Sequence, residues 1–135
     1  MTEVQWVLVT GGSRGIGRAI SLRFATAGWR VLVNFFVNRE AAEKTARDVE
    51  GCGGVAHLVQ ADVKDPAEID RLFGEVARQT DRLDVLVSNA ASGVLRNALD
   101  LQARHLDWVF HTNTRPLLLC AQAAAPLMGQ GGRII

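Results

Sequence analysis

Hydrophobic positions along the chain follow two alternating patterns. Short runs rich in β-branched residues predict strands, and each is followed by a longer stretch with apolar residues at helical spacing. Strict alternation of strand and helix predicts an α/β protein, with a doubly wound parallel sheet in three α/β/α layers. The strand-like runs lie at 6–10, 30–36, 55–62 and 82–90, and a fifth begins in Gly-Gly-Arg-Ile-Ile at 131–135.

Four helical segments separate these runs. The clearest start signal belongs to the third, where Asp65 is a good N-cap, Pro66 suits the first helical position and Glu68 stands three residues after the cap. The other three cover 16–27, 39–50 and a long stretch from about 102 to 128. The predicted apolar faces are Ile16, Ile20, Phe24 and Ala27 in the first helix, and Ile69, Leu72, Phe73, Val76 and Ala77 in the third.

Composition and charge exclude several classes of protein. The 135 residues are 48% hydrophobic and 21% charged, as in a single globular domain. A net charge of +1 argues against nucleic-acid or anionic-membrane partners, and no apolar run reaches the roughly 18 residues of a membrane span. Residues 1–5 show no secretory signal, and two cysteines are too few for a disulfide framework, so we expect a cytoplasmic location.

The first strand-like run enters a turn of small residues, Thr10-Gly11-Gly12-Ser13-Arg14-Gly15-Ile16-Gly17. Small residues let the backbone approach a phosphate, and the following helix N-terminus favours its charge. A P-loop is excluded because Arg18 and Ala19 stand where that motif needs Lys and Ser or Thr. The plain G-x-G-x-x-G pattern also fails, since the glycines fall at 11, 15 and 17.

The turn has the form T-G-x-x-x-G-I-G, and on this motif the chain resembles the N-terminal half of a short-chain dehydrogenase/reductase. The resemblance extends over residues 1–135, which would form the NAD(P)-binding Rossmann-type domain. It implies a nicotinamide dinucleotide cofactor. The cofactor-binding residues that it implies in the turn are Thr10, Gly11, Ser13, Arg14, Gly15, Ile16 and Gly17.

Further matches follow the third and fourth strand-like runs. Asp62-Val63 stands where the family places an acidic residue against adenine, although Asp62 could also simply cap a turn. The stretch 88–91, Ser-Asn-Ala-Ala, is similar to the family's Asn-Asn-Ala-Gly and implies cofactor contacts for Asn89, Ala90 and Ala91. The alternative for Asn89 is an ordinary turn residue.

In the last helix, Asn113 matches the asparagine of the family's catalytic Asn-Ser-Tyr-Lys tetrad, the alternative being a solvated polar residue. Pro116 has no N–H to offer the Thr112 carbonyl. We therefore expect the helix to kink beside Asn113 and to expose a backbone oxygen, to which, by resemblance, a water of the proton relay would bind.

Residues at the end of the second strand indicate the choice of cofactor. Enzymes that use the unphosphorylated cofactor usually carry an acidic residue there to bind the ribose 2′-hydroxyl. Asn34, Phe35 and Phe36 occupy this region, so nothing repels a 2′-phosphate. Arg14 and Arg39 could bind one, although Arg39 could also be a solvated helix-start residue. We predict NADPH, with Asn34 and Arg39 added to the cofactor-binding set.

The stretch 90–96, Ala-Ala-Ser-Gly-Val-Leu-Arg, is similar to that of the NADPH-dependent type III enoyl-[acyl-carrier-protein] reductases. This resemblance implies an acyl thioester substrate on acyl carrier protein, a place in fatty-acid biosynthesis and a homo-oligomeric parent enzyme. A 3-oxoacyl-[acyl-carrier-protein] reductase is the nearest alternative.

Other chemistries fit the sequence poorly. His57, His105 and His111 lack metal-ligand spacing, so no metal site is expected. Ser92 is not in a G-x-S-x-G elbow, and Cys120 on an apolar helix suits a core position.

The composition includes no tyrosine, although the family uses a Ser and a Tyr-x-x-x-Lys for catalysis. We therefore expect a fragment that lacks the C-terminal catalytic half, has its sheet truncated at the fifth strand and is inactive alone. The alternative is a non-catalytic nucleotide-binding half-domain.

Overall fold

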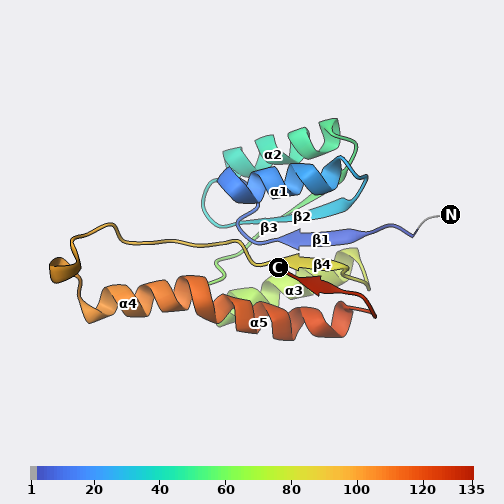
Figure 1. Ribbon diagram of the computed structural model, residues 1–135. Helices are drawn as coiled ribbons and strands as arrows, with labels where there is room; N and C mark the ends of the chain where they lie inside the picture. The colour runs from blue at the N-terminus through green and yellow to red at the C-terminus, as the bar shows by residue number, and fades with distance from the viewer. Residues whose placement is uncertain (1–2) are drawn as a thin grey trace.

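A five-stranded parallel sheet runs through the computed structural model, which describes residues 3–135 (Figure 1). The strand order is β3-β2-β1-β4-β5, so β1 is central and β3 and β5 form the edges. The predicted α/β class is therefore confirmed. The strands are β1 (Trp6–Val9), β2 (Arg30–Phe35), β3 (Val55–Gln60), β4 (Val85–Val87) and β5 (Arg133–Ile134).

Helices cover both faces of this sheet (Figure 1). One face carries α1 (Gly15–Ala25) and α2 (Arg39–Gly51), and the other carries α3 (Pro66–Gln79) and α5 (Arg115–Ala124). Among residues 3–135 there is no helix both long and apolar enough to cross a membrane.

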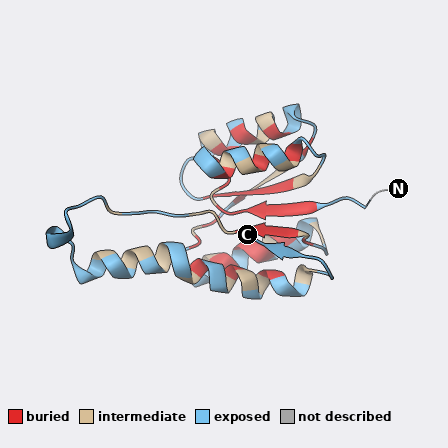
Figure 2. Cartoon of the chain, viewed as in Figure 1, coloured by how far each residue is buried: buried red, intermediate tan, exposed pale blue. Residues whose placement is uncertain are grey.

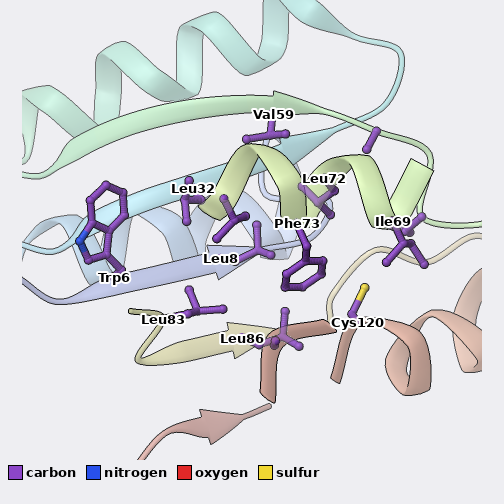
Figure 3. Close-up of a cluster of buried hydrophobic side chains, with 14 residues drawn as sticks. Trp6, Leu8, Leu32, Val59, Ile69, Leu72, Phe73, Leu83, Leu86 and Cys120 are labelled. Carbon is purple, nitrogen blue, oxygen red and sulfur yellow. The ribbon is translucent and has the colours of Figure 1, made fainter. Parts of the chain in front are cut away.

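Residues of the central strands are buried on both faces, as Figure 2 shows. Val7 and Val9 join the cluster beneath α1 and α2. Trp6 and Leu8 join the other cluster, where Leu72 and Phe73 of α3 pack against the sheet (Figure 3). Because apolar side chains alternate between the two faces along each strand, both layers of helices are held to one sheet.

The chain leaves β1 towards β2 and later returns to the other side of β1 to form β4. Segments that follow β1 and β4 therefore diverge at the carboxyl ends of two neighbouring strands. Open α/β sheets bind ligands at such a topological switch point. The glycine turn of residues 10–17 lies there.

The fourth strand is shorter than its sequence suggests, with β4 limited to Val85–Val87 instead of 82–90. The backbone N–H groups of Asn89 and Ala90 donate to the Thr10 hydroxyl, at 3.0 and 3.1 Å, rather than to a neighbouring strand. The apolar run continues beyond the ladder because these residues enter the site.

The apolar face predicted for the first helix is only half right. Ile20 and Phe24 are partly buried and pack against the core, but Ile16 is 75% exposed and Ala27 is exposed beyond the end of α1. The fully buried residues of α1 are Gly17, Ser21 and Ala25. A Cβ at position 17 would lie 2.1 Å from the Gly11 carbonyl oxygen, so this helix approaches the glycine turn too closely for a larger side chain. In α3 the predicted face is confirmed except for Ala77, which is exposed.

The start of α3 follows the predicted N-cap, since the Asp65 carboxylate accepts from the Ala67 N–H at 2.9 Å. Glu68 does not complete a capping box and instead pairs with Arg71 at 2.6 Å. A short 3-10 turn, η1 (Ala98–Asp100), lies in the long segment after β4 and was not anticipated.

The long last helix is present but not uniform. It runs through α4 (Ala103–Val109), the π-helical turn η2 (Phe110–Thr114), α5 and the 3-10 turn η3 (Ala125–Leu127). The Arg115 N–H bonds the Phe110 carbonyl five residues back, immediately before Pro116. Where a kink beside Asn113 was expected, the helix forms a π-helical turn, a feature common at functional sites.

Candidate functional site

A cavity of about 510 Å³ lies where the carboxyl ends of β1, β2, β3 and β4 meet. Four segments that are distant in sequence line it together with Thr112 of η2. Three of them are residues 34–38, which span the end of β2 and the loop that follows it, residues 61–63 after β3 and residues 89–92 after β4. The glycine turn contributes Gly11, Ser13, Arg14, Ile16 and Gly17.

Most of the predicted site residues lie in this lining. Asp62, Val63, Asn89, Ala90, Ala91 and Asn34 join the residues of the glycine turn. The exceptions are Thr10, Gly15, Arg39 and Asn113, which lie next to lining residues in the chain but do not border the cavity themselves.

Thr10 and Asn89 join the ends of β1 and β4 beneath the cavity. The Thr10 hydroxyl donates to the Val87 carbonyl at 3.3 Å and accepts from two N–H groups after β4. In the opposite direction, the side-chain amide of Asn89 donates to the carbonyls of Thr10 and Gly11 at 3.0 and 3.1 Å. Asn89 is therefore more than an ordinary turn residue, because it fixes the glycine turn against β4.

Asn34 fixes the same turn from the other side. Its Oδ1 accepts from the Gly11 N–H at 3.1 Å, and its Nδ2 donates to the carbonyls of Val59 and Ala61 at 3.2 and 3.1 Å. The residue is only 2% exposed. The Asn34 side-chain amide therefore makes its hydrogen bonds within the protein. It can affect a ligand only by fixing the position of Gly11.

Gly11 has a left-handed backbone, with φ of 61°. A Cβ there would also lie 3.0 Å from the Ala90 Cα, so the turn and the segment after β4 are in close contact. Glycine meets both requirements at this position.

Thr45 is a site-supporting residue that sequence reasoning missed. Its hydroxyl donates to the Ser13 carbonyl at 2.7 Å, and both residues are buried. Ser21 supports the turn similarly, donating to the carbonyls of Gly12 and Gly17 at 3.2 and 2.9 Å. The signal available in the sequence was spacing: Thr45 lies at helical spacing from Ala42 and Val49, and the structure shows all three as the buried residues of α2.

Asp62 takes part in a turn and also lies in the lining of the cavity. Its Oδ1 accepts from the Lys64 N–H at 3.0 Å, so it does cap a turn. This contact leaves the carboxylate in the lining of the cavity, beside the buried Val63.

The two arginines proposed for a 2′-phosphate lie in different places. Arg14 is exposed, directly precedes α1 and lines the cavity. The guanidinium carbon of Arg39 lies 5.2 Å from the centroid of the Phe35 ring, and its Nη2 donates to Gln60 at 3.0 Å. Residues 34–39 include no acidic side chain.

Asn113 makes two hydrogen bonds to the backbone of Ser92. Its Oδ1 accepts from the Ser92 N–H and its Nδ2 donates to the Ser92 carbonyl, each at 2.8 Å. The side chain is therefore bonded within the protein rather than merely solvated. This pair attaches the π-helical turn to the segment that borders the cavity after β4.

Outside the cavity, the buried thiol of Cys120 and possible metal-binding clusters were considered as reactive groups in the described part of the chain. Burial raises the pKa of the Cys120 thiol to about 11, so it stays protonated and unreactive at neutral pH. Between Glu3 and Ile135 no three His, Cys, Asp or Glu residues are grouped closely enough to hold a metal ion.

Comparison with known proteins adds independent findings. A family model described as short chain dehydrogenase matches residues 5–135. The 1-cyclohexenylcarbonyl-CoA reductase of Streptomyces collinus is 47% identical over 128 residues, which are 95% of this chain and 46% of the relative. A 3-oxoacyl-[acyl-carrier-protein] reductase of Staphylococcus aureus is 39% identical over 130 residues, 95% of this chain and 52% of the relative.

A solved structure has the same arrangement of elements. The short chain dehydrogenase of Burkholderia cenocepacia, in complex with NADP, aligns with a TM-score of 0.90 and 37% identity, over 96% of this chain and 53% of that one. The present chain therefore spans about half the length of the relatives that it matches.

Proposed function

The chain belongs to the short-chain dehydrogenase/reductase family, and we propose that it forms the NADPH-binding part of a reductase that acts on acyl thioesters. The observation that carries this proposal is the uncapped start of α1 at the edge of the cavity. Arg14, the residue before α1, makes no side-chain hydrogen bond to the first turn of the helix. By contrast, Asn38 and Asp65 cap α2 and α3.

The first N–H groups of a helix have no partner within it. In α1 these groups belong to Gly15, Ile16 and Gly17, two of which line the cavity. Such groups, together with the helix dipole, suit the pyrophosphate of a dinucleotide. The Thr10–Asn89 and Asn34–Gly11 contacts hold the turn in place without ligand, so little ordering is needed on binding.

The remainder of the cavity fits the adenosine end of the cofactor. Asp62 and Val63 lie at the end where the family binds adenine, and Phe36, 55% exposed, borders the cavity beside them. Arg14 supplies a cation for a 2′-phosphate, with no acidic side chain among residues 34–39 to oppose it. NADPH rather than NADH is therefore the proposed cofactor, and the solved relative with bound NADP supports this choice.

When bound, the cofactor would supply a hydride. The chain's own residues would bind and orient the cofactor. Asn89 and Ala90 would contact it from the segment after β4, and Asn113 would hold the part of that segment around Ser92. Residues 1–135 include no tyrosine to provide the phenol that the family uses. Turnover is thus proposed for the complete enzyme, and nucleotide binding without turnover for this chain alone.

We propose an enoyl thioester as the substrate, in keeping with the alkenyl carbonyl-CoA named for the Streptomyces relative. The second candidate is a 3-oxoacyl thioester on acyl carrier protein, favoured by the name of the Staphylococcus relative. A cytoplasmic, homo-oligomeric parent enzyme completes the proposal.

Isothermal titration of residues 1–135 with NADPH and NADH tests the cofactor. Measurable binding with at least about tenfold preference for NADPH is expected, equivalent to about 1.4 kcal/mol. Equal affinities would contradict the cofactor choice, and no binding of either would contradict the proposed site. For the longer enzyme, crotonyl and acetoacetyl thioesters distinguish the two substrate classes.

A further inference from the structure

Gln60, the last residue of β3, connects this strand to both ends of the neighbouring β2–α2 loop. Its Nε2 donates to the Phe36 carbonyl at 2.8 Å, and its Oε1 accepts from Arg39 Nη2 at 3.0 Å. Phe36 is the first residue after β2, and Arg39 is the first residue of α2. One exposed side chain therefore holds residues 36–39 against β3, an edge strand of the sheet.

The Arg39 side chain is held by a second contact. Its guanidinium carbon lies 5.2 Å from the centroid of Phe35, and Phe35 is directly opposite Gln60 in the β2–β3 ladder. A cation over an aromatic ring is attracted by the ring's negative face. Phe35 and Gln60 together restrict a long side chain that would otherwise adopt many rotamers in solvent.

The fastened loop borders the candidate site. Phe36, Val37 and Asn38 all line the cavity, and Arg14 lines it from the glycine turn. Because Gln60 and Phe35 already hold the Arg39 guanidinium, it would lose less conformational freedom on binding a phosphate than a mobile side chain would. The net free energy of a guanidinium–phosphate contact would therefore be more favourable. Gln60 does not border the cavity and can act only through the residues that it holds.

We infer that Gln60 is a positioning residue for cofactor choice: by holding Phe36 and Arg39 it favours a nucleotide that carries a 2′-phosphate over one with a free 2′-hydroxyl. This inference rests on the proposed function, which assigns the cavity to NADPH. It adds a residue outside the glycine turn and outside the cavity lining to the determinants of cofactor specificity.

The test uses two small probes that differ only at the 2′ position, 2′,5′-ADP and 5′-AMP, titrated calorimetrically into residues 1–135. The quantity measured is the ratio of their affinities. In Gln60→Met this ratio is expected to fall about fivefold, as for the loss of one hydrogen bond of about 1 kcal/mol, with 5′-AMP affinity unchanged. Gln79→Met, an exposed glutamine at the end of α3, is the matched control and should leave the ratio unchanged.

Two further variants show whether Gln60 acts through Arg39. Gln60→Glu keeps an acceptor for the guanidinium but has no donor for the Phe36 carbonyl, so recovery of the ratio in this variant assigns the effect to Arg39. Arg39→Met should lower the ratio, and adding Gln60→Met to it should lower it no further. Additive losses would overturn the dependence on Arg39.

The outcomes separate this inference from the function on which it rests. A wild-type chain that binds both probes equally would contradict the proposed NADPH preference. A wild-type chain that prefers 2′,5′-ADP, with the ratio kept in Gln60→Met, would overturn only the role of Gln60. Equal weakening of both probes in Gln60→Met would show a general structural role and would also overturn it. Circular dichroism confirms that each variant is folded.

Discussion

The side chain of Asn113 forms a closed pair of hydrogen bonds with the backbone of Ser92, 21 residues earlier in the chain. One bond is accepted from the Ser92 N–H and the other is donated to its carbonyl, each at 2.8 Å. The pair connects the π-helical turn η2 to the segment after β4. The family resemblance places Asn113 in a catalytic set. In the structure its side chain holds Ser92, which lines one side of the cavity.

Replacing Asn113 with Ala should release this wall. Two hydrogen bonds at an exposed position are together worth about 1–2 kcal/mol, so we expect amide exchange at Ser92 to accelerate roughly tenfold or more. Hydrogen–deuterium exchange read by NMR measures this directly. Asn97→Ala, at an exposed asparagine whose side chain makes no capping bond to η1, is the control. Unchanged protection at Ser92 in Asn113→Ala would contradict the proposed attachment.

Thr45 should prove important despite lying outside the cavity. Thr45→Val keeps the shape of the side chain but removes the donor to the buried Ser13 carbonyl, at an expected cost of about 1–3 kcal/mol in the free energy of unfolding. Thr45→Ser retains the hydroxyl and should recover most of the loss. Urea denaturation gives the free energies, and a valine variant as stable as the wild type would show that the bond contributes nothing.

Gly17→Ala should impair nucleotide binding because its Cβ would lie 2.1 Å from the Gly11 carbonyl oxygen and 2.5 Å from Asn89 Nδ2. The glycine turn would have to move away from β4. Gly74→Ala is the matched control, since this exposed position within α3 has open space and alanine favours helix by about 0.5–1 kcal/mol. We expect calorimetry to show NADPH binding lost in the first variant and retained in the second. Retained affinity in Gly17→Ala would mean that the close approach is not required.

His57 should make stability depend on pH. Burial lowers its pKa, the positive charge of Arg30 lowers it further, and Glu50 opposes the effect. Because the folded pKa lies below the unfolded value of 6.5, protons bind the unfolded chain more readily. The contribution of neutral His57 to the free energy of unfolding is therefore fully present above pH 6.5. It is lost as the pH falls from there towards the lower pKa of the folded state.

The difference in unfolding free energy between the wild type and His57→Leu, followed by urea denaturation across this range, isolates the contribution of His57. The wild type should lose stability relative to the variant as the pH falls. A pH-independent difference would show that His57 titrates alike in the folded and unfolded chains.

Sequence patterns predicted the order of elements and the glycine turn because both are local. The β-branched runs, the Asp65-Pro66 start of α3 and the turn signature each depend on residues within a few positions of one another. The apolar face predicted for the first helix was right at Ile20 and Phe24 but wrong at its start. Periodicity favoured Ile16, whereas Gly17 is the buried residue there, because it lies close to Gly11 in a tertiary contact.

The contacts that complete the site are long-range and could not be deduced in the same way. Thr45 bonds Ser13 across 32 residues and Asn89 bonds Thr10 across 79, and neither pairing has a local sequence signal. Pro116 did signal an irregular helix, but not the form that it takes, which is a π-helical turn over Phe110–Thr114. The resemblance supplied residue positions, and the structure supplies their partners.

We propose that NADPH binds at the glycine turn, with its pyrophosphate on the N-terminus of α1. The most direct measurement is a two-dimensional ¹H–¹⁵N NMR titration of residues 1–135 with NADP⁺. The largest shifts are expected at the amides of Gly15, Ile16 and Gly17, followed by Asn89 and Ala90. Shifts confined to other faces of the molecule, or no shifts at millimolar NADP⁺, would contradict it.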